Sequence, residues 1–248
     1  MLAKPQILLL FLGLPLFAQT VVTVVNYAGY TGTFPVAPGS IASAYGDFGA
    51  IATTSANTVS PMPKELVGVR VRVNAVEAPL YFVSRNQINF VVPVGTATGR
   101  QAVEVVSGGS VVSRGTVNVY DFGPGLASSD TTPARQGIVQ NQNFSVNSSS
   151  ARASRGQVIQ IYATGCGAVS PQVQDGVPPT VLSSSVAAVK AYISGQEAQV
   201  QFAGAHPQFP GICQINAVVP DRPFITGQVP LAVSVSGIES NAVSIWVQ

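Results

Sequence analysis

Short runs in which apolar residues alternate with polar ones recur along this sequence. Val69-Arg70-Val71-Arg72-Val73 is the clearest run, and its alternation is typical of a strand with one buried face and one wet face. Similar runs follow at intervals of about 8–12 residues, without convincing helical periodicity. The pattern predicts strands at 40–45, 69–73, 78–83, 87–92, 101–106 and 115–120, and then at 157–163, 187–193, 198–203, 213–219, 228–236 and 241–247.

The second half of the chain repeats the first. Gln87-Ile88-Asn89-Phe90-Val91-Val92-Pro93 returns as Gln214-Ile215-Asn216-Ala217-Val218-Val219-Pro220, and the segment 77–82 returns as 197–202. A repeat of about one hundred residues is the size of a whole domain. We therefore predict an all-β fold of two tandem immunoglobulin-like antiparallel β-sandwiches that arose by internal duplication, at 19–120 and 156–248.

Residues 121–155 connect the two predicted domains. Much of this segment is polar, as in Asn141-Gln142-Asn143 and Ser148-Ser149-Ser150. It is either a flexible linker or a short hairpin packed at the domain junction. Apolar side chains inside it favour the hairpin, and they are Ile138, Val139, Phe144 and Val146.

The first 18 residues have the order of a secretory signal peptide. Lys4 gives a positive start, an apolar run follows from Ile7 to Phe17, and Ala18-Gln19 offers a cleavage position. The run is too short to span a bilayer, and no later apolar stretch reaches transmembrane length. We predict a mature chain that is secreted, periplasmic or displayed at the cell surface; the alternative for 1–18 is a buried first strand.

Charged residues make up only 9% of the chain, and the formal net charge is +2. Nucleic-acid binding needs a stripe of Lys and Arg, which the sequence lacks. One histidine and two cysteines cannot complete a zinc site without carboxylates, and the sequence has neither a calcium loop nor a phosphate-binding glycine motif. We expect no metal and no cofactor.

The two cysteines, Cys166 and Cys213, flank strands of the second repeat. Export permits a disulfide between them, and the chain-entropy model makes a long closed loop strongly stabilising. The alternative is a pair of separate buried thiols. We predict the disulfide.

The only histidine, His206, lies in an insertion of the second repeat. A serine triad would place it beside a serine and an acid, and the sequence has no Gly-x-Ser-x-Gly elbow. His206 is either an ordinary loop residue or a lone general base near Asp221 or Glu197. The sequence assigns no catalytic residue.

Two candidate binding features remain. In each repeat a Gln-x-Asn pair shares one strand face, at Gln87 and Asn89 and at Gln214 and Asn216. These amides form a polar ledge for a sugar or peptide, or they hold a neighbouring loop. Tyr27, Tyr30 and Phe34 cluster before the first shared strand, as a binding patch or as a cap on the core.

Several motifs resemble the Solibacter-type uncharacterised C-terminal domain of exported acidobacterial proteins. They include Ala37-Pro38-Gly39-Ser40-Ile41, the segment 78–84, Gln87-Ile88-Asn89-Phe90, the segment 161–169 and Gly211-Ile212-Cys213-Gln214. The resemblance covers about residues 25–248 and implies an exported protein without an assigned activity. Each half is also similar to immunoglobulin-like modules of the IPT/TIG kind.

These observations predict a non-catalytic binding or scaffolding module of the cell envelope or extracellular space. Its partner would be envelope polysaccharide or another exported protein. The alternatives are a secreted hydrolase acting on glycan or peptide, and a structural stalk.

Overall fold

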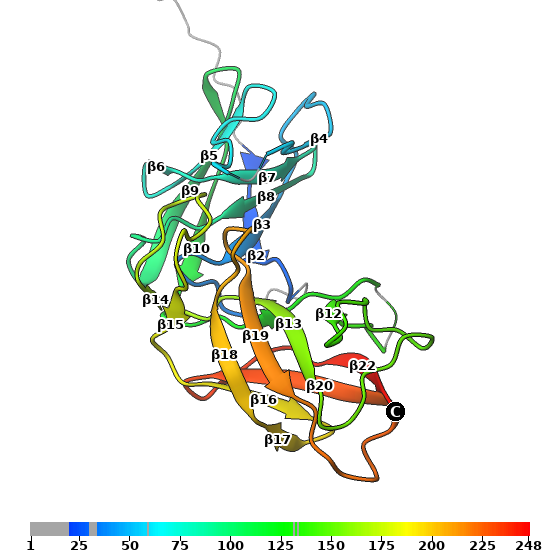
Figure 1. The fold of residues 1–248 in the computed structure, drawn as a ribbon. Coiled ribbons are helices and arrows are strands. Elements are labelled where there is room, and N and C mark those ends of the chain that lie inside the picture. Colours follow the sequence, from blue (N-terminus) through cyan, green and yellow to red (C-terminus); the bar gives the residue numbers. More distant parts are fainter. Residues whose placement is uncertain (1–19, 30–33, 59, 131, 133) are drawn as a thin grey trace, which may run out of the picture.

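The protein consists of two β-sandwiches, one above the other in Figure 1. This computed structural model describes residues 20–29, 34–58, 60–130, 132 and 134–248. The predicted signal peptide and Tyr30 lie outside the described residues. Every element in the described part of the chain is a strand, and none of it forms a helix with the length and apolar character of a membrane crossing.

The first sandwich has two sheets, which we call sheets A and B. Sheet A has the order β1 (Thr20–Val21), β10 (Ser110–Val119), β9 (Gly99–Ser107), β5 (Val69–Val73), β6 (Val76–Glu77). Sheet B has the order β2 (Thr23–Asn26), β3 (Ile41–Tyr45), β8 (Gln87–Val91), β7 (Leu80–Val83), β4 (Thr54–Ser55). Val69, Val71 and Val73 are buried between the sheets, as their alternation predicted.

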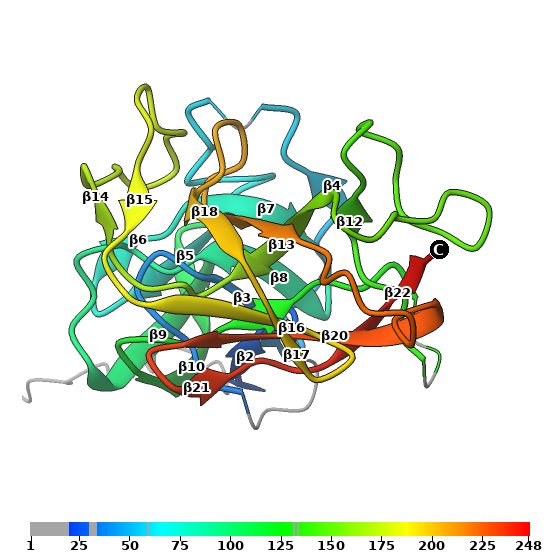
Figure 2. The ribbon, with the colours of Figure 1, turned by 60° about the horizontal axis from the view of Figure 1, so that its bottom comes forward.

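The second sandwich has sheets C and D, which Figure 2 separates. Sheet C has the order β11 (Gly125–Leu126), β13 (Val158–Thr164), β19 (Cys213–Val218), β18 (Val200–Ala205), β15 (Ser184–Ser185), β14 (Val169–Ser170), and β12 (Val139–Gln140) also pairs with β13. Sheet D has the order β17 (Gln196–Ala198), β16 (Val189–Ile193), β20 (Gly227–Val235), β21 (Ile238–Glu239), and β22 (Val243–Val247) also pairs with β20.

The pairing of strands supports the internal duplication. Tyr45 lies opposite Gln87 in sheet B, and Tyr162 lies opposite Gln214 in sheet C. The pairing shifts register between Leu80 and Phe82 in the first repeat and between Val200 and Phe202 in the second. Because bulges are features that related folds retain, their recurrence at the same repeat position is expected of duplicated domains.

The connecting segment contributes two short strands to the second sandwich. β11 and β12 both pair antiparallel with β13. Val139 is buried in the second core, whereas Phe144 and Val146 are exposed. The segment therefore extends sheet C, and only some of its predicted apolar anchors are buried.

The two sandwiches meet where a loop of the second lies on the outer face of sheet B. This loop joins β18 to β19 and spans residues 206–212. The Tyr81 hydroxyl donates to the carbonyl of Pro210 at 2.6 Å. The Ile41 amide donates to Oγ1 of Thr164 at 2.8 Å, and that hydroxyl donates to the carbonyl of Gly211 at 2.8 Å.

A second loop of the second sandwich reaches back beside the first. The amide of Val94 donates to the Asp175 carboxylate at 2.7 Å, and the amide of Met62 donates to the carbonyl of Gly176 at 2.8 Å. At the centre of the junction, the Gly123 amide donates to the Gly165 carbonyl at 2.9 Å. These contacts fix the sandwiches relative to one another.

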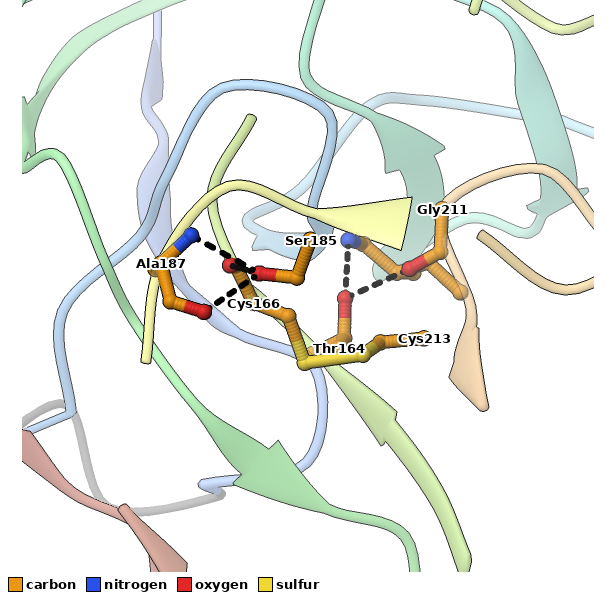
Figure 3. The surroundings of a disulfide bond; sticks show 7 residues. Thr164, Cys166, Ser185, Ala187, Gly211 and Cys213 are labelled. Carbon is orange, nitrogen blue, oxygen red and sulfur yellow. Dashed lines mark hydrogen bonds between the residues drawn. A yellow bond between two sulfur atoms is a disulfide. The ribbon is translucent and has the colours of Figure 1, made fainter. Parts of the chain in front are cut away.

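The predicted disulfide between Cys166 and Cys213 is present and joins the end of β13 to the start of β19. Figure 3 shows Thr164 and Gly211 next to it, so the bond lies at the base of the junction loop. The cysteines are 47 residues apart, for which the chain-entropy model gives about 4 kcal/mol.

Replacing both cysteines by alanine should lower the free energy of unfolding by about 2–4 kcal/mol, because the unfolded chain regains the entropy of the open loop. Urea unfolding of the wild-type and double-variant proteins measures the difference. Equal unfolding midpoints would contradict this account of the bond.

Gly165→Ala should destabilise the protein more than Gly195→Ala. The two glycines have φ values of +74° and +75°, so alanine meets a similar backbone cost of about 1–2 kcal/mol at each. A Cβ at Gly165 would lie 1.8 Å from the carbonyl oxygen of Gly123, whereas a Cβ at Gly195 meets nothing within 4 Å. Denaturant unfolding measures the free energy of unfolding of both variants. Equal losses would show that the backbone at the junction can move to accommodate the added methyl group.

Candidate functional site

An open groove with a volume of about 850 Å³ lies between the two sandwiches, where the outer faces of sheets B and C approach one another. Sheet B and the segment before it contribute Tyr27, Ile41, Tyr81 and Asn89. The second sandwich contributes the rest of the lining, which is Ala127, Ile138, Gln140, Phe144, Gln160, Tyr162, His206, Pro207, Gln208, Phe209, Ile212 and Gln214.

Strand alternation places Gln160 and Tyr162 in the groove. They are residues i and i+2 of β13, so both point to the outer face, while Ile159 and Ile161 are fully buried in the core. Gln140 lies opposite Gln160 on the neighbouring strand β12. Three polar side chains from two paired strands therefore form one wall.

Tyr162 holds the amides of this wall. Its hydroxyl lies 2.6 Å from Oε1 of Gln140 and 3.2 Å from Oε1 of Gln160, and its one hydrogen is shared between them with the nearer Gln140 oxygen favoured. Burial raises the pKa of Tyr162 above its ordinary value. The hydroxyl therefore keeps its proton, and the hydrogen bond, throughout the neutral range.

Tyr81 forms part of the opposite side of the groove. Burial, with a smaller contribution from Tyr27, raises its pKa well above the ordinary range. Its hydroxyl stays protonated and continues to donate to Pro210, which holds the 206–212 loop on sheet B.

His206 acts as an anchor of that loop. Its Nδ1 accepts from the backbone amides of Gln208 at 3.0 Å and Phe209 at 3.1 Å. The ring is 8% exposed and packs edge-on against Tyr162. Burial lowers the pKa of the imidazole, so His206 is neutral at pH 7.

The carboxylates proposed as partners of His206 are paired elsewhere. Glu197 accepts from the Lys190 ammonium at 3.1 Å on β16, and Asp221 lies 3.8 Å from Arg155. The groove lining contains no acidic residue. Within the described ranges, no three His, Cys, Asp or Glu residues cluster as metal ligands would.

The structure places three of the predicted binding residues in the groove lining, and Tyr30 lies outside the described residues. Tyr27, Asn89 and Gln214 line the groove. Phe34 lines a different cavity of about 570 Å³ beside β10, and Gln87 and Asn216 are outside the groove lining. In each repeat the Gln side chain donates to the Asn at 2.9 Å, so the pairs bond internally and do not hold a loop.

Sequence interpretation missed Gln140, Gln160, Tyr162, Phe144 and Phe209. The alternation of 158–162 is a usable signal for Gln160 and Tyr162, because it assigns both to the exposed face of a strand. Phe144 is an apolar residue within a polar run, a pattern that predicts a buried anchor. It is in fact 69% exposed.

No protein-family model matches the sequence, and no curated protein matches it. Solved structures similar to the chain include a glucan-utilization protein, a β-glycosidase, an adhesin and tandem Ig repeats. SGBP-B of the Bacteroides ovatus mixed-linkage glucan utilization locus is 14% identical with a TM-score of 0.34, over 86% of this chain and 44% of that one. The Escherichia coli adhesin FdeC is 12% identical with a TM-score of 0.27, over 94% and 65%.

The tandem Ig repeats of Dlar are 12% identical, with a TM-score of 0.23, over 93% of this chain and 99% of that one. The predicted all-β fold of two tandem sandwiches is confirmed by the four sheets of the structure. It spans less than half the length of the Bacteroides ovatus protein, and these likenesses do not assign the groove.

His206 should make stability depend on pH. Its pKa is lower in the folded than in the unfolded state, so the unfolded chain binds more protons as pH falls below about 6.5. We expect wild type to lose stability between pH 7 and pH 5. His206→Asn keeps a side-chain acceptor for the turn and does not titrate, so its loss should be smaller. Urea unfolding midpoints of both proteins at pH 7 and pH 5 measure the loss of stability. An equal loss in wild type and His206→Asn would contradict this role of His206.

Proposed function

We propose that this protein is an exported, non-catalytic binding module whose ligand lies in the groove between its two sandwiches. The observation that carries the proposal is the groove itself. Its walls come from both repeats, and the junction hydrogen bonds hold them in place. Its volume of about 850 Å³ lies within the range of ligand sites.

The chemistry of the lining favours binding over catalysis. General acid–base catalysis needs a titrating group within reach of substrate. The only histidine is a buried loop anchor whose Nδ1 is already used, and no carboxylate lines the groove. The hydrolase alternative therefore lacks its residues at this site.

Phe144 gives a second, independent reason to assign a ligand to the groove. This bulky residue has φ of +64°, where side chains other than glycine and asparagine are strained. The strain costs about 1–3 kcal/mol. Because the Phe144 side chain is 69% exposed, its burial offsets little of this cost. The turn is fixed by Asn141, whose carbonyl accepts from the amide of Phe144 at 2.8 Å. An exposed aromatic side chain kept in a strained turn at a groove is typical of a binding residue.

Location and partner follow from the chemistry of the surface. A disulfide supports an extracytoplasmic compartment, in keeping with a signal peptide at 1–18. Arg70 and Arg72, the paired cations of β5, lie within 4 Å of Glu77, which argues against a nucleic-acid partner. The proposed partner is envelope polysaccharide or another exported protein. The resemblance to the Solibacter-type domain and the domain bounds 19–120 and 156–248 remain part of this proposal.

Phe144→Asn should weaken binding without weakening the fold. Asparagine tolerates positive φ, so the free energy of unfolding should stay unchanged or rise by up to about 1 kcal/mol. The mature chain, immobilised, is incubated with native envelope material, and the retained carbohydrate and protein are quantified. Wild type should retain material saturably, and Phe144→Asn should retain several-fold less.

Phe224→Asn is the matched control, because Phe224 is 60% exposed and does not line the groove. It should retain as much as wild type. Release of reducing ends or free amines during incubation would support the hydrolase instead. Equal retention by wild type and Phe144→Asn would place the binding surface outside the groove, and no retention by either would favour the structural stalk.

A further inference from the structure

We infer that the ligand of the groove is a neutral glycan, an inference that rests on the proposed binding function. The groove presents unbonded amide donors and acceptors beside aromatic faces, and its lining has no charged side chain.

The hydrogen bonds of the wall leave a defined set of polar groups for a ligand. A side-chain amide carries one acceptor oxygen and two donor hydrogens on nitrogen. Tyr162 uses the oxygens of Gln140 and Gln160, so their two amide nitrogens remain as donors. Neither nitrogen has a partner among the residues that the structure describes.

Gln214 and Asn89 add groups of both kinds. The Gln214 nitrogen donates to Asn216, which leaves its oxygen as an acceptor. The Asn89 oxygen accepts from Ser43 and Gln87, which leaves its nitrogen as a donor. A hydroxyl group both donates and accepts, so a polyhydroxylated ligand can use the donors and the acceptor together.

The aromatic side chains supply the apolar part of the site. Phe144 and Phe209 are 69% and 44% exposed at the groove, and Tyr27 lies on the other side. A sugar ring has faces of C–H bonds that pack on aromatic rings by dispersion, while its rim hydroxyls remain free to hydrogen-bond. Aromatic faces beside side-chain amides match both parts of such a ring.

The absence of charge in the lining excludes anionic ligands. Uronic acids, sulfated sugars and phosphates are recognised by Arg or Lys, which form charge-assisted hydrogen bonds. The lining side chains include neither, nor any Asp or Glu for a cationic ligand. Tyr81, Tyr162 and His206 are all neutral at pH 7, because burial raises the pKa of the tyrosines and lowers that of the histidine.

An extended peptide fits the groove less well. Peptides commonly add to an open sheet edge through backbone hydrogen bonds. The polar groups here are side chains on strand faces, and the outer edge of β12 is already bridged, from Gln140 to Val146. The groove therefore offers little backbone to a peptide.

The test uses the mature chain on a printed array that carries neutral glucans, mannans, xylans and galactans beside uronate-containing glycans, sulfated glycans and peptides. Binding should be confined to neutral glycans and should not change between low and high salt. Affinity for the strongest neutral glycan is then measured by calorimetry for wild type and variants.

Gln140→Glu removes the amide donors and adds a negative charge, while its oxygen can still accept from Tyr162. Affinity should fall about tenfold or more. Gln142→Glu is the matched control, because Gln142 also uses its oxygen, accepting from the Val158 amide at 3.0 Å, and lies outside the groove lining. It should bind as wild type does. Gln160→Glu, which should also lose affinity, replaces Gln140→Glu if that variant fails to fold.

The outcomes separate this inference from the proposed function. Binding only to acidic glycans or peptides, sensitive to Phe144→Asn, would overturn the neutral-glycan inference and leave the binding function standing. Neutral-glycan binding equal in wild type, Gln140→Glu and Gln160→Glu would also overturn it. An array without any neutral-glycan signal counts against it in the same way.

Discussion

The contact of the 206–212 loop with the outer face of sheet B sets how the two sandwiches lie relative to one another, and with it the shape of the groove. Tyr81 and Thr164 hold the loop by two hydrogen bonds, the Ile41 amide of sheet B donates to that same Thr164 hydroxyl, and the disulfide fixes the C-terminal end of the loop at Cys213. Domains of one chain commonly meet through small, polar interfaces that allow relative motion. Here the loop, the 172–177 segment and the Gly123–Gly165 contact oppose such motion, so the groove keeps one shape.

Burial controls the chemistry of the groove as well as its form. It raises the pKa of both tyrosine hydroxyls and lowers that of the imidazole, so each serves as a fixed hydrogen-bonding group near pH 7.

Local alternation was enough to predict the long strands, because one-face burial leaves a period of two in the sequence, and the duplication was visible in the return of residues 87–93 as 214–220. The short strands β4, β6, β14, β15 and β17 were missed, since two or three residues carry too little pattern and are set by their neighbours. Tyr27 and Phe34 line different cavities, although the Asn26 side chain donates to the carbonyl of Pro35 at 2.8 Å and so holds the two segments together. The groove brings together residues as far apart in the sequence as Tyr27 and Gln214, and a local sequence pattern cannot predict that they meet.

The 206–212 insertion has no counterpart in the first repeat, where three residues join β7 to β8. It contributes no residue to either main core, and its Ile212 packs instead on a small apolar cluster of Ile41, Met62 and Val91. Duplication thus supplied two stable scaffolds, and a single added loop converted the surface between them into a cavity. A change in the length or sequence of this one loop would therefore reshape the groove and leave the strands of both sandwiches in place.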